Sequence, residues 1–166
     1  MSASSYIIKC YGITKDPETN NFMLVMEYAK NGSLRQSLNK TFISMGWDNK
    51  IKILYDIAVG LSSIHREGLI HQDFHSGNIL RFSDGYSRIT DLGLCKPADD
   101  KSEKNVYGVL PYVAPEVLRG KAYTQASDIY GFESSFMKYL MDYYLEVLAV
   151  KICQGLRPNF ILKYQN

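Results

Sequence analysis

Two carboxylates and an amide in the middle of the chain could hold a hard cation beside a reacting phosphate. Asp73 comes shortly before Asn78, and Asp91 follows two short strand-like runs separated by an Asp-Gly turn signal. A hairpin there would place Asn78 opposite Asp91, and amide and carboxylate oxygens are ligands that Mg²⁺ accepts. Asp73 would lie close by. This arrangement suits phosphoryl transfer, in which catalysis is mostly positioning and charge neutralisation. The alternative is a loop and hairpin whose Asp and Asn side chains cap turns.

Composition limits the classes of protein that the chain can belong to. Its 166 residues, 46% of them hydrophobic, suffice for one sizeable core but not for two full domains. The net charge of +2, without any Lys/Arg block, gives no sign of a nucleic-acid partner. We expect neither a signal peptide nor a membrane span. Cys10, Cys95 and Cys153 are odd in number and far apart, which favours the reducing cytoplasm over a disulfide framework or a zinc site.

Hydrophobic patterns predict strands at the start of the chain and helices after them. Residues 6–14 and 22–28 read as two strands, and residues 34–39 as a short helix. Residues 47–66 form the clearest helix, which Gly68 can end in a left-handed conformation. Its apolar stripe, which we expect to be core, comprises Ile51, Leu54, Ile57, Ala58, Leu61, Ile64 and His65.

Three motifs in order resemble those of the protein kinase family. They are His71-Gln72-Asp73 with Asn78, then Asp91-Leu92-Gly93, then Ala114-Pro115-Glu116, against H-R-D-x-x-x-x-N, D-F-G and A-P-E in the family. Any one alone would be weak, but three in order are specific. The resemblance implies an α+β fold, with a remnant of the small-lobe sheet and the hinge over residues 6–28 and a mainly α-helical large lobe over residues 29–166. We expect one partial domain over residues 1–166, incomplete at both ends.

The resemblance also implies a catalytic and a metal-binding role. Asp73 would accept or orient the proton of the substrate hydroxyl, while Asn78 and Asp91 would bind Mg²⁺. His75 stands where Ser/Thr kinases usually carry a lysine that contacts the transferred phosphate, and it could substitute in part if protonated. The cofactors implied are therefore ATP and Mg²⁺.

Nucleotide-binding roles follow from the same resemblance. Met26 would lie at the back of the pocket, and Leu80 would form the floor beneath the adenine. Glu27 and Ala29 would offer backbone groups to the adenine edge, and Ser33 would lie near the ribose. Without the family match, simple core packing would be the better reading of Met26 and Leu80.

Other motif residues are implied to be structural. His71 would pack beneath the catalytic loop, and Asp128 would brace that loop. Gly93 would let the backbone bend after the metal site. Glu116 would form an ion pair with Arg157.

Several family features are not found in this sequence. It contains neither G-x-G-x-x-G nor the lysine of V-A-I-K, so we expect little or no activity from this chain alone. Gln72 replaces the arginine beside the catalytic aspartate, which makes ordering by phosphorylation less expected. The residue types at positions 31–34 and 76–78 most resemble those of the tyrosine-kinase-like group. The segment 131–150 departs from the family, and the apolar helix expected over residues 136–152 would need a protein partner or a second copy to cover it.

Three hypotheses therefore stand. The first is a protein kinase of a signalling pathway, which transfers the ATP γ-phosphate to a Ser/Thr or Tyr hydroxyl of a protein substrate. The second is a catalytically inactive kinase-like module that binds partners. The third is a truncated gene fragment without independent function.

Overall fold

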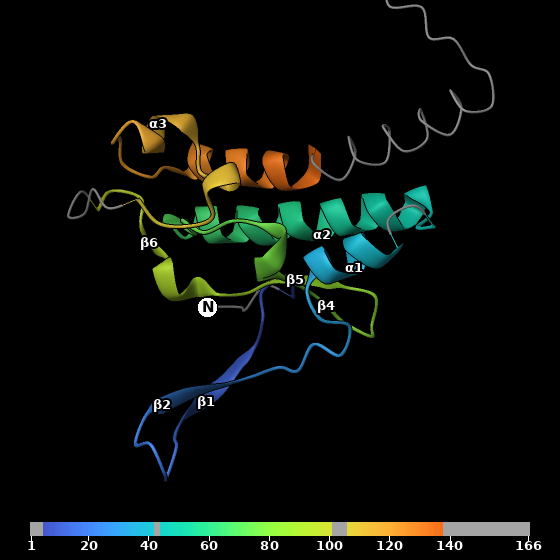
Figure 1. Ribbon diagram of the computed structural model, residues 1–166, viewed down its shortest axis with the longest axis vertical. Coiled ribbons are helices and arrows are strands. Elements are labelled where there is room, and N and C mark those ends of the chain that lie inside the picture. Colours follow the sequence, from blue (N-terminus) through green and yellow to red (C-terminus); the bar gives the residue numbers. More distant parts are fainter. Residues whose placement is uncertain (1–4, 42–43, 101–105, 138–166) are drawn as a thin grey trace, which may run out of the picture.

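A computed structural model describes residues 5–41, 44–100 and 106–137 (Figure 1). The strands are β1 (Cys10–Lys15), β2 (Phe22–Met26), β3 (Leu69–Ile70), β4 (Ile79–Arg81), β5 (Ser87–Ile89) and β6 (Lys96–Pro97). The helices are α1 (Leu34–Thr41), α2 (Trp47–Arg66) and α3 (Pro115–Leu118), and residues 125–137 are also helical. This mixture of short strands and helices confirms the predicted α+β class. The helix predicted over residues 136–152 lies almost wholly outside the described residues.

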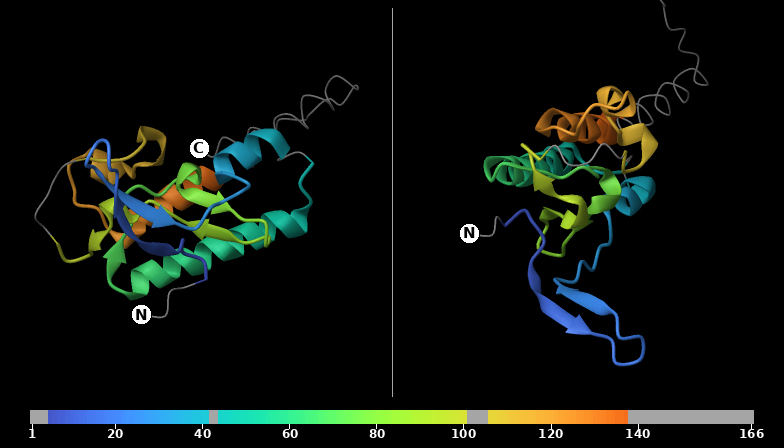
Figure 2. Two further views of the ribbon diagram at one scale, coloured as in Figure 1. Left: turned by 90° about the horizontal axis from the view of Figure 1, so that it is seen from below. Right: turned by 90° about the vertical axis from the view of Figure 1, so that its left-hand side faces the viewer.

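The long helix α2 lies at the centre of the molecule. It runs between the helical residues 125–137, drawn in orange, and the β4–β5 hairpin (Figure 1). The perpendicular views agree with this layering (Figure 2). The β1–β2 hairpin projects from the opposite side to the orange helix, and it exposes nearly all of its side chains.

The predicted β4–β5 hairpin is present, but its register differs by one residue from our expectation. Leu80 pairs with Arg88, and the Thr90 N–H donates to the Asn78 carbonyl at 2.9 Å. Asn78 is therefore opposite Thr90, and the expected pairing with Asp91 was wrong. The cause is the turn, in which Gly85 has a φ of 81° and closes a shorter loop than the one we assumed.

Helix α2 has the predicted bounds, and Gly68 follows it with a φ of 70°. Of the predicted stripe, Ile57, Leu61 and Ile64 are buried in the core, together with side chains of α1, β4 and β5. Ile51, however, is 59% exposed and Ala58 is exposed as well, so the assignment of both to the core was wrong. Together with the half-buried Leu54, they line an open groove of about 780 Å³ between α2 and the helical residues 125–137.

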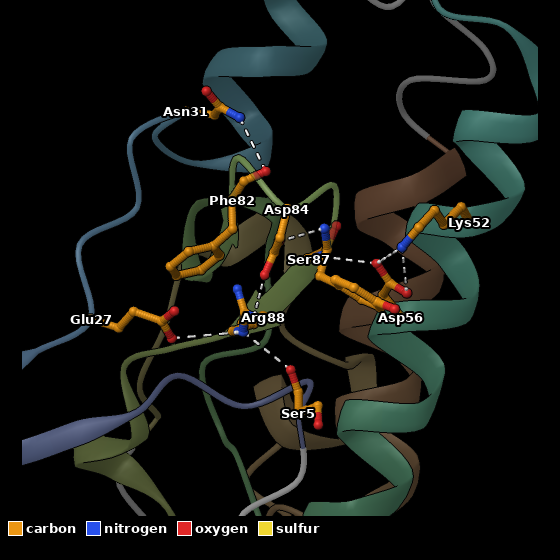
Figure 3. A network of polar contacts seen from close by, with 10 residues as sticks. Ser5, Glu27, Asn31, Lys52, Asp56, Phe82, Asp84, Ser87 and Arg88 are labelled. Carbon is orange, nitrogen blue, oxygen red and sulfur yellow. Dashed lines mark hydrogen bonds and ion pairs between the residues drawn. The ribbon is translucent and has the colours of Figure 1, made fainter.

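A buried carboxylate joins α2 to the β4–β5 hairpin (Figure 3). Asp56 is 1% exposed, accepts the Ser87 N–H at 2.9 Å and lies 3.1 Å from the Lys52 Nζ. One charged partner and one backbone donor offset the cost of burying the charge. This contact fixes the position of the hairpin, and hence of the residues at its open end, against the central helix.

Within the described ranges, no helix has both the length and the apolar composition that crossing a bilayer requires.

Replacement by alanine should lower the free energy of unfolding more on the buried side of α2 than on its exposed side. We expect Leu61→Ala to lower the free energy of unfolding by about 2 to 5 kcal/mol, because it leaves a cavity in the core. Ile51→Ala, on the exposed side of the same helix, should cost less than about 1 kcal/mol. Urea unfolding followed by circular dichroism measures both values. Equal losses for the two variants would contradict the burial pattern described here.

Candidate active site

The loop that carries Asp73 is held by a carboxylate from far along the chain. Asp128 is 2% exposed, and its two oxygens accept the backbone N–H groups of His71 and Gln72 at 2.8 and 2.9 Å. The Nε2 atom of His65 lies 2.9 Å from the same carboxylate. These contacts hold Gln72 at a φ of 69°, a left-handed conformation that a side chain other than glycine rarely adopts.

His71 connects this loop to the β4–β5 hairpin. Its ring is fully buried, Nε2 lies 3.0 Å from the Thr90 carbonyl, and Nδ1 accepts the Asp73 N–H at 3.3 Å. The tautomer with its proton on Nε2 satisfies both contacts. The imidazole therefore lies beneath the loop and bonds the two segments that bring Asp73 and Asp91 to the site.

The structure brings Asp73 and Asn78 into direct contact. The Asn78 Nδ2 donates to the Asp73 carbonyl at 2.9 Å and to its Oδ2 at 3.0 Å. Both amide hydrogens are thereby used, so the Asn78 Oδ1 faces away from Asp73. The other carboxylate oxygen of Asp73, Oδ1, is buried and has no hydrogen-bond partner among the described residues.

His75 lies beside the second oxygen of Asp73. Its Nδ1 accepts the Gly77 N–H at 3.0 Å, so the ring proton is on Nε2, which is 3.5 Å from the Asp73 Oδ1. Burial lowers the pKa of His75, an effect that Arg35 reinforces and that the opposing attraction of Asp73 does not cancel. At neutral pH the ring is therefore uncharged.

Asp91 lies at the rim of a cavity that Asn78 also lines. The cavity measures about 620 Å³ and is lined by both residues. Asp91 has a φ of 61°, whereas Gly93 has no positive φ and belongs to a 3₁₀ turn, Leu92–Leu94. After the hairpin, the residue in a left-handed conformation is therefore Asp91. We had expected the chain to bend at Gly93 instead.

The predicted nucleotide-binding residues divide into two groups. Met26 and Leu80 line the same cavity as Asn78 and Asp91. Glu27, Ala29 and Ser33 follow Met26 along the chain and are not among its lining residues. The Glu27 N–H donates to the Lys9 carbonyl at 3.0 Å, and the Ala29 carbonyl accepts the Gly32 N–H at 3.1 Å. The Ser33 Oγ accepts the Gln36 N–H at 3.3 Å, at the start of α1.

Sequence reasoning missed five residues of the cavity wall. Ile8 and Cys10 belong to the first predicted strand and Leu24 to the second, while Thr90 and Leu92 flank Asp91. Their signal was present in the predicted strands, because a strand that reaches the site exposes alternate side chains to it. Glu116 is half-buried in α3, while its expected partner Arg157 lies outside the described residues.

Comparison with known proteins identifies the family. A model of the protein kinase domain matches residues 1–145. A probable serine/threonine-protein kinase of Dictyostelium discoideum is 32% identical over 128 residues, which cover 76% of this chain and 14% of that protein. The L-type lectin-domain containing receptor kinase S.1 of Arabidopsis thaliana is 38% identical over 146 residues, 84% of this chain and 20% of the relative. Dual specificity testis-specific protein kinase 2 of Rattus norvegicus is 39% identical over 113 residues, 64% of this chain and 20% of the relative.

The chain therefore belongs to the protein kinase family, as the three motifs predicted. It spans about a fifth or less of the length of these relatives. The family generally uses ATP and Mg²⁺.

Removing the Asp128 carboxylate should destabilise the domain strongly. Asp128→Ala leaves two buried backbone N–H groups without acceptors, for which we expect a loss of about 2 to 5 kcal/mol in the free energy of unfolding. Glu133→Ala, an exposed position on the same helical segment, should stay within about 0.5 kcal/mol of the parent. Urea titrations at pH 7 measure both. A loss for Asp128→Ala no greater than that of the control would show that the loop does not depend on this carboxylate.

Stability should fall as the pH is lowered below neutrality, in part through His75. Because its pKa is lowered in the folded protein, the unfolded chain takes up the proton first as the pH falls. The contribution of His75 is complete above its ordinary pKa of about 6.5 and is lost as the pH falls from there through the folded value. His75→Gln should therefore lose less stability between pH 7.5 and pH 5 than the parent, as measured by urea midpoints. Parallel pH profiles would contradict this.

Proposed function

We propose that Asp73, Asn78 and Asp91 form the phosphoryl-transfer site of a protein kinase that phosphorylates a hydroxyl of a protein substrate with ATP and Mg²⁺. The observation that carries this proposal is one cavity with two kinds of wall. Asn78 and Asp91 supply oxygen ligands, whereas Met26 and Leu80 supply an apolar surface. An adenine ring suits the apolar part, and a metal-bound phosphate chain suits the polar part.

The donor set at the polar end fits Mg²⁺. The hydrogen bonds from Asn78 Nδ2 to Asp73 leave the amide oxygen available, and Asp91 adds a full negative charge in an exposed position. Hard oxygen ligands of this kind, completed by phosphate oxygens and water, are those that Mg²⁺ takes in nucleotide sites. When bound, Mg²⁺ would neutralise charge on the phosphates.

Asp73 is the proposed acceptor for the proton of the substrate hydroxyl. Asn78 holds its Oδ2, whereas Oδ1 has no hydrogen-bond partner among the described residues. The uncharged His75 can donate its Nε2 proton toward Oδ1 and thereby orient the carboxylate. We propose this orienting role for His75, rather than the direct contact with phosphate that a lysine would make.

Two backbone groups are proposed to recognise the adenine edge. The Glu27 N–H is already bonded to Lys9, and the Ala29 carbonyl is bonded to Gly32. The Glu27 carbonyl and the Ala29 N–H therefore remain, one acceptor and one donor, which match the adenine amino group and a ring nitrogen. Ser33, which caps α1, is proposed to lie near the ribose.

The finer assignments are proposals of the same kind. The segments 31–34 and 76–78 support the tyrosine-kinase-like group, and named Ser/Thr and dual-specificity relatives support a hydroxyl acceptor on a protein. The described cysteines, Cys10 and Cys95, are free thiols, which suits the cytoplasm. We further propose that a protein partner covers the apolar groove beside α2.

A binding module without catalytic activity is the second candidate. It is favoured by Gln72, which cannot bind a phosphate as arginine does, and by the uncharged His75. Binding of ATP without transfer of labelled phosphate to a mixed peptide library would support this alternative. Transfer that Asp73→Asn abolishes would support the kinase.

Binding of ATP should depend on Mg²⁺ through Asp91. We expect Mg²⁺ to tighten the binding of ATP to the parent chain in calorimetric titrations. Asp91→Ala should remove this gain and weaken Mg²⁺-dependent binding by roughly tenfold or more, because the site loses its charged ligand. Asp99→Ala, an exposed carboxylate outside the cavity lining, is the matched control and should leave the affinity unchanged. An unchanged Mg²⁺ gain in Asp91→Ala would overturn the assignment of the metal site.

A further inference from the structure

A buried arginine contacts three separate segments of the chain (Figure 3). Arg88 of β5 is 7% exposed. Its Nη2 donates to the Asp84 carboxylate at 2.6 Å, and its Nε donates to the Ser5 carbonyl at 3.1 Å. The guanidinium also lies over the Phe82 ring, 4.2 Å from the centroid. These contacts hold the cation in one orientation, since a guanidinium is planar and its donors are in fixed positions.

The remaining neighbour of this cation is Glu27, which follows Met26 along the chain. Its Oε2 lies 3.7 Å from the Arg88 Nε, within ion-pair range but too far for a hydrogen bond. In the described part of the chain, this buried oxygen has no hydrogen-bond partner, and neither has the Arg88 Nη1. A carboxylate oxygen shielded from water in this way depends on the nearby positive charge, because an unpaired buried charge is costly.

The pair joins two segments that neighbour lining residues of the proposed nucleotide cavity. Arg88 is directly opposite Leu80 in the hairpin, and opposed side chains of an antiparallel pair lie on the same face. Leu80 lines one wall, and Met26, next to Glu27, lines the other. The ion pair therefore sets the separation of the segment after β2 from the hairpin that forms the proposed adenine floor.

Backbone contacts attach the projecting β1–β2 hairpin at its two ends. Before β1, Ile8 and Ile89 are joined by an N–H···O bond of 2.9 Å. After β2, the Arg81 N–H donates to the Gly32 carbonyl at 2.9 Å. Glu27 lies between these attachments along the chain, directly after β2. An added side-chain contact at this point restrains the part of the chain that carries the proposed adenine-binding groups.

We propose that Arg88 is a positioning residue for the nucleotide and that it acts through Glu27. Its guanidinium holds the segment 27–32 at a fixed distance from Leu80. The Glu27 carbonyl and the Ala29 N–H belong to this segment and are positioned with it. The proposal rests on the proposed nucleotide site. Arginine suits this role because its planar fork can reach Asp84, Ser5 and Glu27 while its face packs on Phe82, which a lysine cannot do.

Calorimetric titration with Mg²⁺–ATP tests the proposal in a double-mutant cycle. We expect Glu27→Gln, which keeps the backbone groups and removes only the charge, to weaken binding about three- to tenfold. Arg88→Gln should do the same, and the double variant should be no weaker than the worse single variant, because the two changes remove one interaction. Glu18→Gln is the matched control, since Glu18 is exposed in the turn between β1 and β2 and lies outside the cavity lining. It should stay within twofold of the parent.

Hydrogen exchange of the ligand-free protein separates this proposal from that of the nucleotide site. In Glu27→Gln and Arg88→Gln, the Gly32 N–H, which is bonded to Ala29, should exchange several-fold faster, while amides within α2 keep their rates. If the parent protein does not bind ATP but the Gly32 N–H still exchanges faster in both variants, the positioning pair is supported and the nucleotide site is overturned. Unchanged exchange, or additive effects of the two substitutions on ATP affinity, would overturn the positioning role of Arg88.

Discussion

The contact on which the site most depends is the one between the Asp128 carboxylate and two consecutive backbone N–H groups, those of His71 and Gln72. Successive amides point to one acceptor only where the chain turns sharply, and here Gln72 is in the left-handed region. Such a residue costs on the order of 1–3 kcal/mol, which the surrounding contacts must offset. A buried carboxylate can do so because hydrogen bonds to a charged acceptor are roughly twice as strong as neutral ones. The helical residues 125–137 thus determine the conformation of a loop far from them in sequence.

From this contact, hydrogen bonds lead to Thr90 and Asn78, two polar residues of the cavity. His71 bonds the Thr90 carbonyl, and the Thr90 N–H bonds the carbonyl of Asn78. Asn78 in turn holds Asp73. The next residue after Thr90 is Asp91, also left-handed and exposed to the cavity. The loop and the hairpin are therefore joined by a connected set of bonds, so that a change in one bond shifts its neighbours as well.

Local patterns in the sequence predicted which helices and strands form better than they predicted how these elements pack and pair with one another. The bounds of α2 were predictable because its apolar residues are periodic and Gly68 ends it. The core side of α2 was predicted only in part, since Ile51 continues the pattern but faces an open groove. The register of the β4–β5 hairpin was wrong by one residue, because the conformation of Gly85 decides the length of the loop. No local pattern shows that Asp128 reaches His71, a contact that followed from the family resemblance alone. The protonation of His75 required the burial and hydrogen bonds of the folded state.

The two walls of the cavity differ in how firmly the chain holds them. The wall that contains Leu80 belongs to a hairpin packed against α2 and fixed by Asp56. The wall that contains Met26 belongs to β1 and β2, whose side chains are exposed, with Phe22 78% and Ile13 70% accessible. A two-stranded hairpin has little stability by itself. Its position therefore depends on the backbone attachments at its ends and on the charge of Arg88, so that nucleotide affinity is expected to be more sensitive to these few contacts than to the large core beneath.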